Sequence, residues 1–232
     1  VRAPRRASSN PLAPLSPQWP WDTASARLPA RQPPWDSPQT IGLNFTAALQ
    51  TDPPGRVPPS PSGAAGIGEV GVFVDGRLYA FDKATGSLLL SLGADQFFDP
   101  VRAGVPTSRP RLRFDPTSGR WIMAAVTAAA SSNHVLLAVS AGSSLSASSV
   151  FTFFEFQQDQ VAPVGNGGQA VADLSLGVDA NAVYLAGDMF AGTTFVNTSA
   201  WVVNKASLLG PGPVMATAFR NVQVVGDAAP QP

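Results

Sequence analysis

Short hydrophobic runs separated by turn residues dominate the chain from Gly63 onward. Alternation of apolar and polar positions over a few residues is the pattern of half-buried β-strands, and the runs contain the β-branched and aromatic residues that strands favour. On this pattern we predict strands at residues 70–74, 77–81, 87–92, 111–114, 121–126, 135–140, 151–156, 174–178, 182–186, 199–203 and 222–225. The sequence therefore predicts an all-β fold.

The residues between these runs predict tight hairpins. Asp75-Gly76 separates two hydrophobic runs and predicts a two-residue hairpin. Segments 81–86 and 114–119 share the form Phe-Asp-x-x-Thr/Ser-Gly, and a weaker copy lies at 203–208. In such a turn the aspartate accepts hydrogen bonds from backbone amides, and the glycine takes the left-handed conformation. Repeated hairpins of this design predict a modular β architecture built from blade-sized repeats.

The first 62 residues differ from the rest because they are rich in proline, which favours extended chain over helix or central strand. We interpret residues 1–40 as an extended arm, whose tryptophans Trp19, Trp21 and Trp35 are candidates for docking onto a surface. The alternative is a coil that happens to contain aromatic residues. Residues 41–46 alternate and predict a lone strand, so that 41–62 is a strand plus a proline-rich spacer. Residues 63–232 form the predicted β domain.

Composition narrows the classes of function. Charged residues make up only 13% of the chain, and 21 glycines with 23 prolines suit short strands and tight turns. A formal net charge of zero gives no global attraction to nucleic acid. Cysteine is absent, which excludes disulfides, a thiol nucleophile and thiolate metal sites. No apolar run is long enough to cross a bilayer, and the start at Val1 leads us to expect a chain whose targeting segment has been removed.

The residues that could carry catalysis have commoner structural uses. His134 is the only histidine, and the turn-like sequence before it favours a structural role. Paired carboxylates could hydrolyse a glycosidic bond, but turn aspartates are common for local hydrogen bonding. The candidates are Asp95, Asp99, Asp115, Asp173, Asp179 and Asp188. No catalytic residue is therefore assigned, and a glycan-active or carbohydrate-binding protein is the alternative.

Binding motifs are equally sparse. Asp173, Asp179 or Asp188 could help to hold a structural calcium ion, but the chain has no EF-hand loop, and we expect no cofactor. Asn44 and Asn197 begin sequons for N-glycosylation. The glycine-rich segment 63–68 lacks the lysine and following helix of a phosphate-binding loop, so we expect an ordinary loop there.

Several segments occur in an order known from other proteins. Gly-Leu-Asn-Phe at 42–45 precedes Tyr-Ala-Phe-Asp-Lys-Ala-Thr-Gly at 79–86, and Asp-Gln-Phe-Phe at 95–98 precedes Pro-Arg-Leu-Arg-Phe-Asp at 110–115. From residue 41 to about residue 210 the chain resembles a family of secreted β-propeller proteins. The resemblance implies six or seven blades, an extracellular or cell-surface location, and no assigned catalytic site.

The resemblance also implies an incomplete ring. A blade needs roughly 40–50 residues, so residues 63–232 supply about three to four blades. Open strand edges and an extended arm would then be association surfaces. The Pro-Ser segment at 58–62 resembles the hydroxyproline-rich segments of algal and plant extracellular matrix glycoproteins. We therefore expect a non-catalytic structural or adhesive subunit that assembles with other protein subunits, itself or a companion chain, at a cell surface, matrix or filament.

Overall fold

The computed structural model describes residues 42–48, 60–74, 76–211 and 213–224 of the chain. In these residues strands account for almost all regular structure, which confirms the predicted all-β fold. The strands are β1 (Ser62–Ala65), β2 (Glu69–Val74), β3 (Arg77–Asp82), β4 (Leu88–Gly93), β5 (Thr107–Asp115), β6 (Arg120–Thr127), β7 (His134–Ser140), β8 (Phe151–Gln157), β9 (Ala170–Val178), β10 (Ala182–Ala191), β11 (Thr194–Asn204) and β12 (Ala216–Val224). Two short helices, α1 (Ala94–Phe97) and α2 (Lys205–Leu209), lie between strands.

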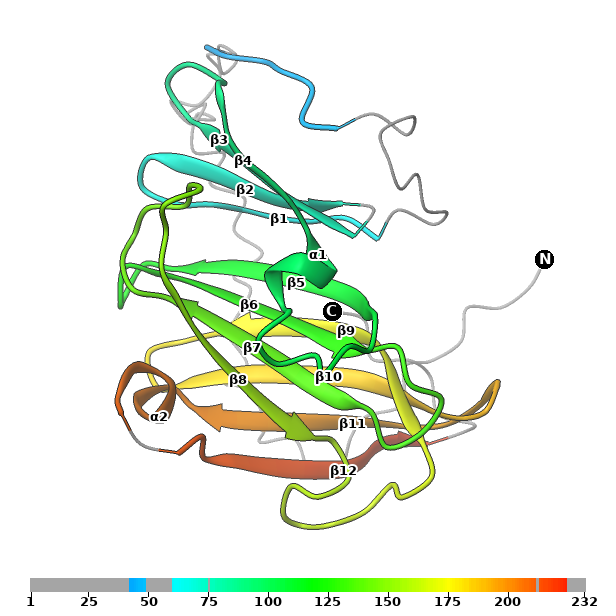
Figure 1. Ribbon diagram of the computed structural model, residues 1–232. Coiled ribbons are helices and arrows are strands. Elements are labelled where there is room, and N and C mark those ends of the chain that lie inside the picture. The colour runs from blue at the N-terminus through cyan, green and yellow to red at the C-terminus, as the bar shows by residue number, and fades with distance from the viewer. Residues whose placement is uncertain (1–41, 49–59, 75, 212, 225–232) are drawn as a thin grey trace, which may run out of the picture. The chain divides into compact units, whose positions relative to one another are not determined.

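The strands form three four-stranded antiparallel sheets (Figure 1). The first sheet is β1-β2-β3-β4, the second is β5-β6-β7-β8 and the third is β9-β10-β11-β12, with each strand paired to its neighbour in the sequence. All pairing is therefore local, and each sheet is a meander whose last strand leads to the first strand of the next sheet. Neither helix in the described part of the chain is long and apolar enough to span a bilayer.

Two hydrophobic cores join the sheets, and β6 contributes to both of them. Trp121 and Met123 belong to the core between the first and second sheets, called here the first seam. Ile122 and Ala124 belong to the core between the second and third sheets, the second seam. Successive residues of a strand point to opposite faces, so a strand between two seams is apolar at every position. This explains the unbroken hydrophobic run of β6, which lies in the middle sheet.

The first strands of the three sheets lie next to one another, because β5 contacts both β1 and β9. Arg111 of β5 links all three sheets through its guanidinium group. Its Nε donates to the carbonyl oxygen of Leu174 in β9 at 2.6 Å, and its Nη1 donates to the Ser60 hydroxyl before β1 at 3.1 Å. The sheets are thus held together at their β1, β5 and β9 sides by hydrogen bonds as well as by the two cores.

The predicted turn chemistry is confirmed at 81–86 and 114–119, whereas the weaker copy at 203–208 leads into helix α2 instead of a hairpin. Asp82 accepts hydrogen bonds from the amides of Ala84 and Thr85, and Gly86 has a φ of +73°. In the second turn Asp115 accepts from the amides of Thr117 and Ser118, and Gly119 has a φ of +66°. Gly76, with a φ of +74°, lies in the predicted hairpin between β2 and β3.

Some predicted boundaries are wrong. Residues 42–46 form no strand. Phe45 instead packs against Phe81 of β3, with ring centroids 5.0 Å apart. The loop expected at 63–68 is shorter, because Ser62–Ala65 pair with β2 as strand β1 and the predicted spacer ends earlier. The last sheet has longer strands than predicted, because β9 and β11 extend over polar residues, such as Asp173 and the buried Asn197, where the sequence has no hydrophobic run. The arm at 1–40, with Trp19, Trp21 and Trp35, lies outside the described residues.

Candidate functional site

The aspartates considered for catalysis each bind a side chain or backbone amide of the protein. Two of them form ion pairs with neighbouring arginines: Asp99 with Arg102 at 2.7 Å, and Asp173 with Arg109 at 3.1 Å. The remaining contacts are Asp95 with the Thr107 amide at 2.6 Å, Asp115 with Lys205 at 2.8 Å, Asp179 with the Asn181 amide at 2.7 Å, and Asp188 with the Thr198 hydroxyl at 2.8 Å. Asp99, Asp179 and Asp188 thus have the turn and strand-pairing roles that such aspartates commonly have, whereas Asp95, Asp115 and Asp173 contact residues of another element.

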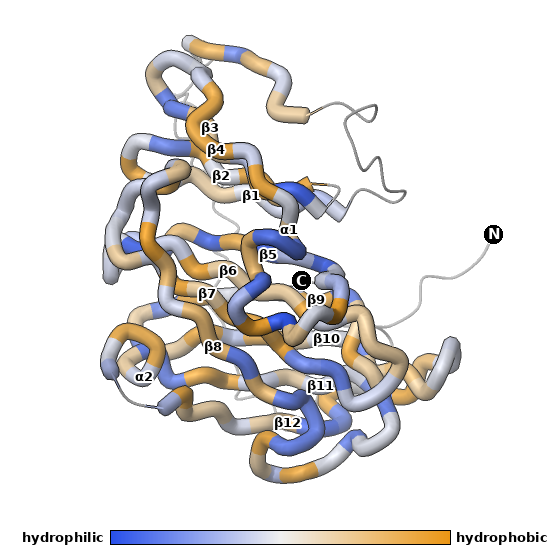
Figure 2. Tube along the Cα trace, viewed as in Figure 1, coloured by the Kyte–Doolittle hydropathy of each residue, from blue (hydrophilic) through white to orange (hydrophobic). Residues whose placement is uncertain are grey.

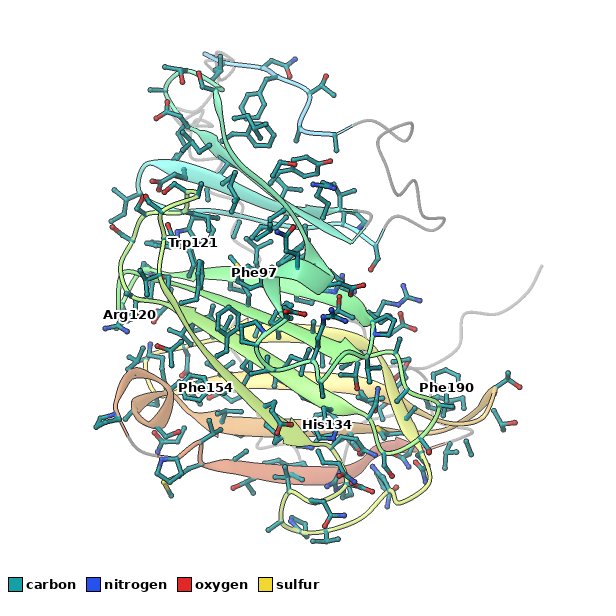
Figure 3. All side chains as sticks on the ribbon, in the orientation of Figure 1. Phe97, Arg120, Trp121, His134, Phe154 and Phe190 are labelled. Carbon is teal, nitrogen blue, oxygen red and sulfur yellow. The ribbon has the colours of Figure 1, made fainter. Side chains whose placement is uncertain are left out.

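His134 lies at the start of β7 on the surface of the second sheet (Figure 3). Its ring contacts the carboxylate of Glu155 on the neighbouring strand β8, two residues before Gln157, which is the ladder partner of His134. Its backbone amide donates to the Thr127 hydroxyl at 2.9 Å. The histidine therefore forms a cross-strand pair. Among the described residues no three His, Asp or Glu side chains group in a way that could hold a metal ion.

The two sequons lie in different surroundings. Asn44 is exposed. Asn197 is only 2% exposed in the third sheet, where its amide nitrogen lies 3.4 Å from the side-chain oxygen of Gln169 and its side-chain oxygen accepts from the Ser199 hydroxyl. A glycan on Asn197 would have to break this packing, so Asn44 is the sequon with room for one.

The second seam contains a buried ion pair that the sequence analysis did not identify. Lys205, which begins α2 directly after β11, donates to Asp115 at the end of β5 at 2.8 Å, and both side chains are at most 5% exposed. Lys205 also donates to the backbone carbonyl of Asp179 at 2.6 Å. The pair thus joins the second sheet to the third, at the end of each sheet where its first strand turns into its second.

Hydrogen bonds keep the Asp115 carboxylate charged despite its burial. Desolvation raises the pKa of this carboxyl group, but hydrogen bonds from Lys205, the Ser118 hydroxyl and the Thr117 amide together lower it below its ordinary value. Lys205 gains a compensating charge and two acceptors in return. A buried charge with such partners is retained, whereas one left alone is strongly destabilising.

At the corresponding place in the first seam, no ion pair joins the sheets in the part of the chain that the structure describes. The turn between β1 and β2 contains Gly66, and a β-carbon on this glycine would clash with the ring of Trp121. Trp121 is fully buried between the two sheets (Figure 3), and its indole nitrogen donates to the carbonyl of Ser143 at 2.8 Å. The first seam is therefore closed by an aromatic ring packed on glycine backbone, and the second by an ion pair.

Hydrophobic side chains also lie on the outer face of the first sheet, away from the first seam. On β2, Gly71 and Phe73 contact residues of the first seam, so the alternate residues Val70, Val72 and Val74 face outward, and each is only half-buried. Figure 2 shows hydrophobic residues along β3 and β4 as well as along the central strands β6 and β7. This sheet is apolar on both faces although only one face lies in a seam.

The outer face of the third sheet carries aromatic and small residues. Tyr184 of β10 is 41% exposed and Phe219 of β12 is 50% exposed. Both lie on the face opposite the second seam, because their strand neighbours Val183 and Ala218 are buried in that seam. Among the described residues the outer faces of the first and third sheets therefore keep hydrophobic side chains partly exposed, although Phe45 packs on part of the first of these faces.

The outermost strand β8 lines hydrophobic grooves on both of its sides. Phe151 and Phe153 line one groove with Leu90 and Leu92 of β4. The neighbouring phenylalanines, of which Phe154 is labelled in Figure 3, face a second groove against Val161, Val214 and Ala216. Both grooves lie where the outer strands of adjacent sheets diverge, so they mark the rims of the two seams.

Comparison with known proteins identified no relative of this chain. No protein-family model matches the chain, and no curated protein and no solved structure is similar to it.

Proposed function

We propose that this chain is a non-catalytic structural subunit of the β-propeller type, which acts by assembling with further sheets of the same kind. Three consecutive four-stranded meanders with adjacent first strands support this proposal, because propeller blades are four-stranded sheets arranged around a common axis. The observation that carries the proposal is that these two outer faces keep hydrophobic surface exposed among the described residues. An apolar sheet face is stable when it is packed against another layer, and an exposed one marks an interaction site.

The proposal predicts self-association that depends on the outer face of the first sheet. Val72→Lys places a charge at the middle of this face, where it would be desolvated in any assembly, so we expect the dissociation constant to rise at least about tenfold. Sedimentation velocity over a range of protein concentrations measures this, with far-ultraviolet circular dichroism to establish that the variant is folded.

The matched control is Val150→Lys, because Val150 is 69% exposed in the loop before β8 and lies on neither outer face. It should associate like the unchanged chain. A chain that remains monomeric at every concentration, or a Val72→Lys variant that associates normally, would contradict the proposed function.

We also propose that the subunit acts outside the cell, as its resemblance to secreted propeller proteins implies. Expression in a eukaryotic secretory system should then give one N-glycan, on Asn44, because Asn197 is buried. Intact-mass spectrometry before and after enzymatic deglycosylation measures the number of glycans. Asn44→Gln should remove the mass difference, whereas Asn197→Gln should leave it unchanged. A glycan on Asn197 would show that this part of the third sheet is not folded when the chain is modified.

A further inference from the structure

The chain has only two lysines, and they occupy equivalent positions in the first and third sheets. Lys83 directly follows β3 and Lys205 directly follows β11, the third strand of each sheet. The backbone amide of Lys83 donates to Gly68 at 2.8 Å, and that of Lys205 donates to Asn181 at 2.9 Å. Both acceptors lie in the turn between the first and second strands of the same sheet.

The side chains of the two lysines also repeat their contacts. Nζ of Lys83 donates to the carbonyl of Gly66 at 3.0 Å, and Nζ of Lys205 donates to the carbonyl of Asp179 at 2.6 Å. Each acceptor is two residues before the residue that accepts the lysine's backbone amide. The two lysines therefore occupy the same structural position in two copies of one repeat.

Two aspartates are equivalent in the same way. Asp115 ends the first strand of the second sheet, and Asp179 directly follows the first strand of the third sheet. Each accepts a hydrogen bond from the amide two residues further on, Thr117 at 3.1 Å and Asn181 at 2.7 Å. In the second seam the lysine of one sheet meets the aspartate of the preceding sheet, as Lys205 meets Asp115.

This rule leaves one lysine and one aspartate for which the described residues hold no neighbouring sheet. Lys83 belongs to the first sheet, so its partner would be an aspartate of a preceding sheet. Asp179 belongs to the third sheet, so its partner would be a lysine of a following sheet. Both side chains are exposed. Opposite charges at the two ends of the stack are complementary to each other.

The hydrophobic faces repeat in the same order. Val183 and Leu185 of β10 face the second sheet in the second seam. Their counterparts in β2 are Val70 and Val72, because Ala182 and Glu69 occupy the same place after their turns, accepting the amides of Asp179 and Gly66. The outer face of the first sheet thus has hydrophobic residues, Val70 and Val72, at the positions that the third sheet uses to pack against the second. Phe45 and Leu43 contact this face at Phe81 and Gly86, and the two valines keep part of their surface exposed.

We propose that two copies of this chain close a ring of six sheets, in which the third sheet of each copy packs on the first sheet of the other and Asp179 pairs with Lys83 of the second copy. This rests on the proposed function and names its partner. A two-fold axis makes both new seams identical and leaves no outer face uncovered. Six sheets also lie within the usual range of about four to eight blades for closed propellers.

The expected assembly of the full chain is a dimer of twice 24.0 kDa, about 48 kDa, by light scattering and sedimentation velocity. Lys83→Asp places two carboxylates in each seam, and Asp179→Lys places two ammonium groups there. Each change should raise the dimer dissociation constant at least about tenfold. Asp99→Lys is the control, because Asp99 is exposed in a surface ion pair with Arg102. It should leave the dimer unchanged.

Mixing the two weakened variants is the decisive experiment. In a mixed dimer one seam has the original Asp179–Lys83 pair and the other has the pair reversed, so a dimer of about 48 kDa should return when Lys83→Asp and Asp179→Lys chains are combined. Because Asp179 also caps its turn, circular dichroism must show that Asp179→Lys is folded. If it is not, Asp179→Asn, which retains acceptors for the turn, replaces it with a smaller expected loss.

The outcomes separate this inference from the proposed function. An open series of larger oligomers, or a dimer indifferent to both charge changes and not restored by mixing, overturns the ring but leaves assembly through the outer faces intact. A chain that stays monomeric overturns both. A dimer that each variant weakens and the mixture restores supports the ring.

Discussion

Asp115→Ala is expected to lower the free energy of unfolding by about 3–5 kcal/mol, because it leaves the ammonium group of Lys205 buried without its carboxylate. Chemical denaturation monitored by tryptophan fluorescence measures this loss. The matched control is Asp82→Ala, which removes the same residue from a turn of the same sequence form. Asp82 has no lysine partner and its contacts are within its own turn, so its loss should be much smaller.

Two further measurements show whether the ion pair is the cause. Adding Lys205→Met to Asp115→Ala should cost less than the sum of the single changes, because no unpaired charge then remains. The pKa of Asp115 is lower in the folded chain than in the unfolded chain, so its contribution is present at neutral pH. It is lost as the pH falls from about 4 through the folded-state pKa, and the difference between the unchanged chain and Asp115→Ala should shrink there. Additive single changes, or a difference that grows in acid, would contradict this account.

Local pattern predicted most of the strands and turns, because each hairpin is formed by residues close in the sequence. The hydrophobic runs of β2, β3, β6 and β7 are visible without a structure, and so is the Asp-Gly hairpin after Val74. Strand β1 was missed because Ser62–Ala65 has no hydrophobic alternation. It forms because its backbone pairs with β2, and that pairing cannot be read from its side chains.

The repeated Phe-Asp turns were a misleading guide to the repeat. Asp82 lies between the third and fourth strands of its sheet, whereas Asp115 lies between the first and second strands of its own. The structural counterpart of Asp115 is Asp179, in a turn of different sequence. Similar turns arise wherever the chain reverses with the same chemistry, so turn sequence alone does not give the position within a sheet.

The candidate site could not be found from the sequence for a related reason. Lys205 and Asp115 are 90 residues apart, and nothing in the residues around either one indicates the other. The sequence does offer one signal: its only two lysines, Lys83 and Lys205, each follow a strand and an aspartate or asparagine. The structure gives that signal its meaning by placing both lysines against the same turn of their sheets.

We expect a second large loss of stability when Trp121, which is buried in the first seam, is replaced. Trp121→Ala should lower the free energy of unfolding by about 3–5 kcal/mol, because the ring is fully buried against the first sheet and Phe114. Denaturation monitored by far-ultraviolet circular dichroism is the suitable measurement, since the substitution removes a fluorescent residue.

Gly66 provides the test that this loss comes from the contact between ring and backbone. A β-carbon at Gly66 clashes with Trp121, so Gly66→Ala should cost about 1–3 kcal/mol in the unchanged chain. In the Trp121→Ala background the methyl group enters the space left by the ring, and the same change should cost little or add stability. Gly68→Ala is the matched control, because its β-carbon would meet no atom within 4 Å. If Gly66→Ala costs the same in both backgrounds, the first seam is not closed by tryptophan on glycine, and the contrast with the ion pair of the second seam is lost.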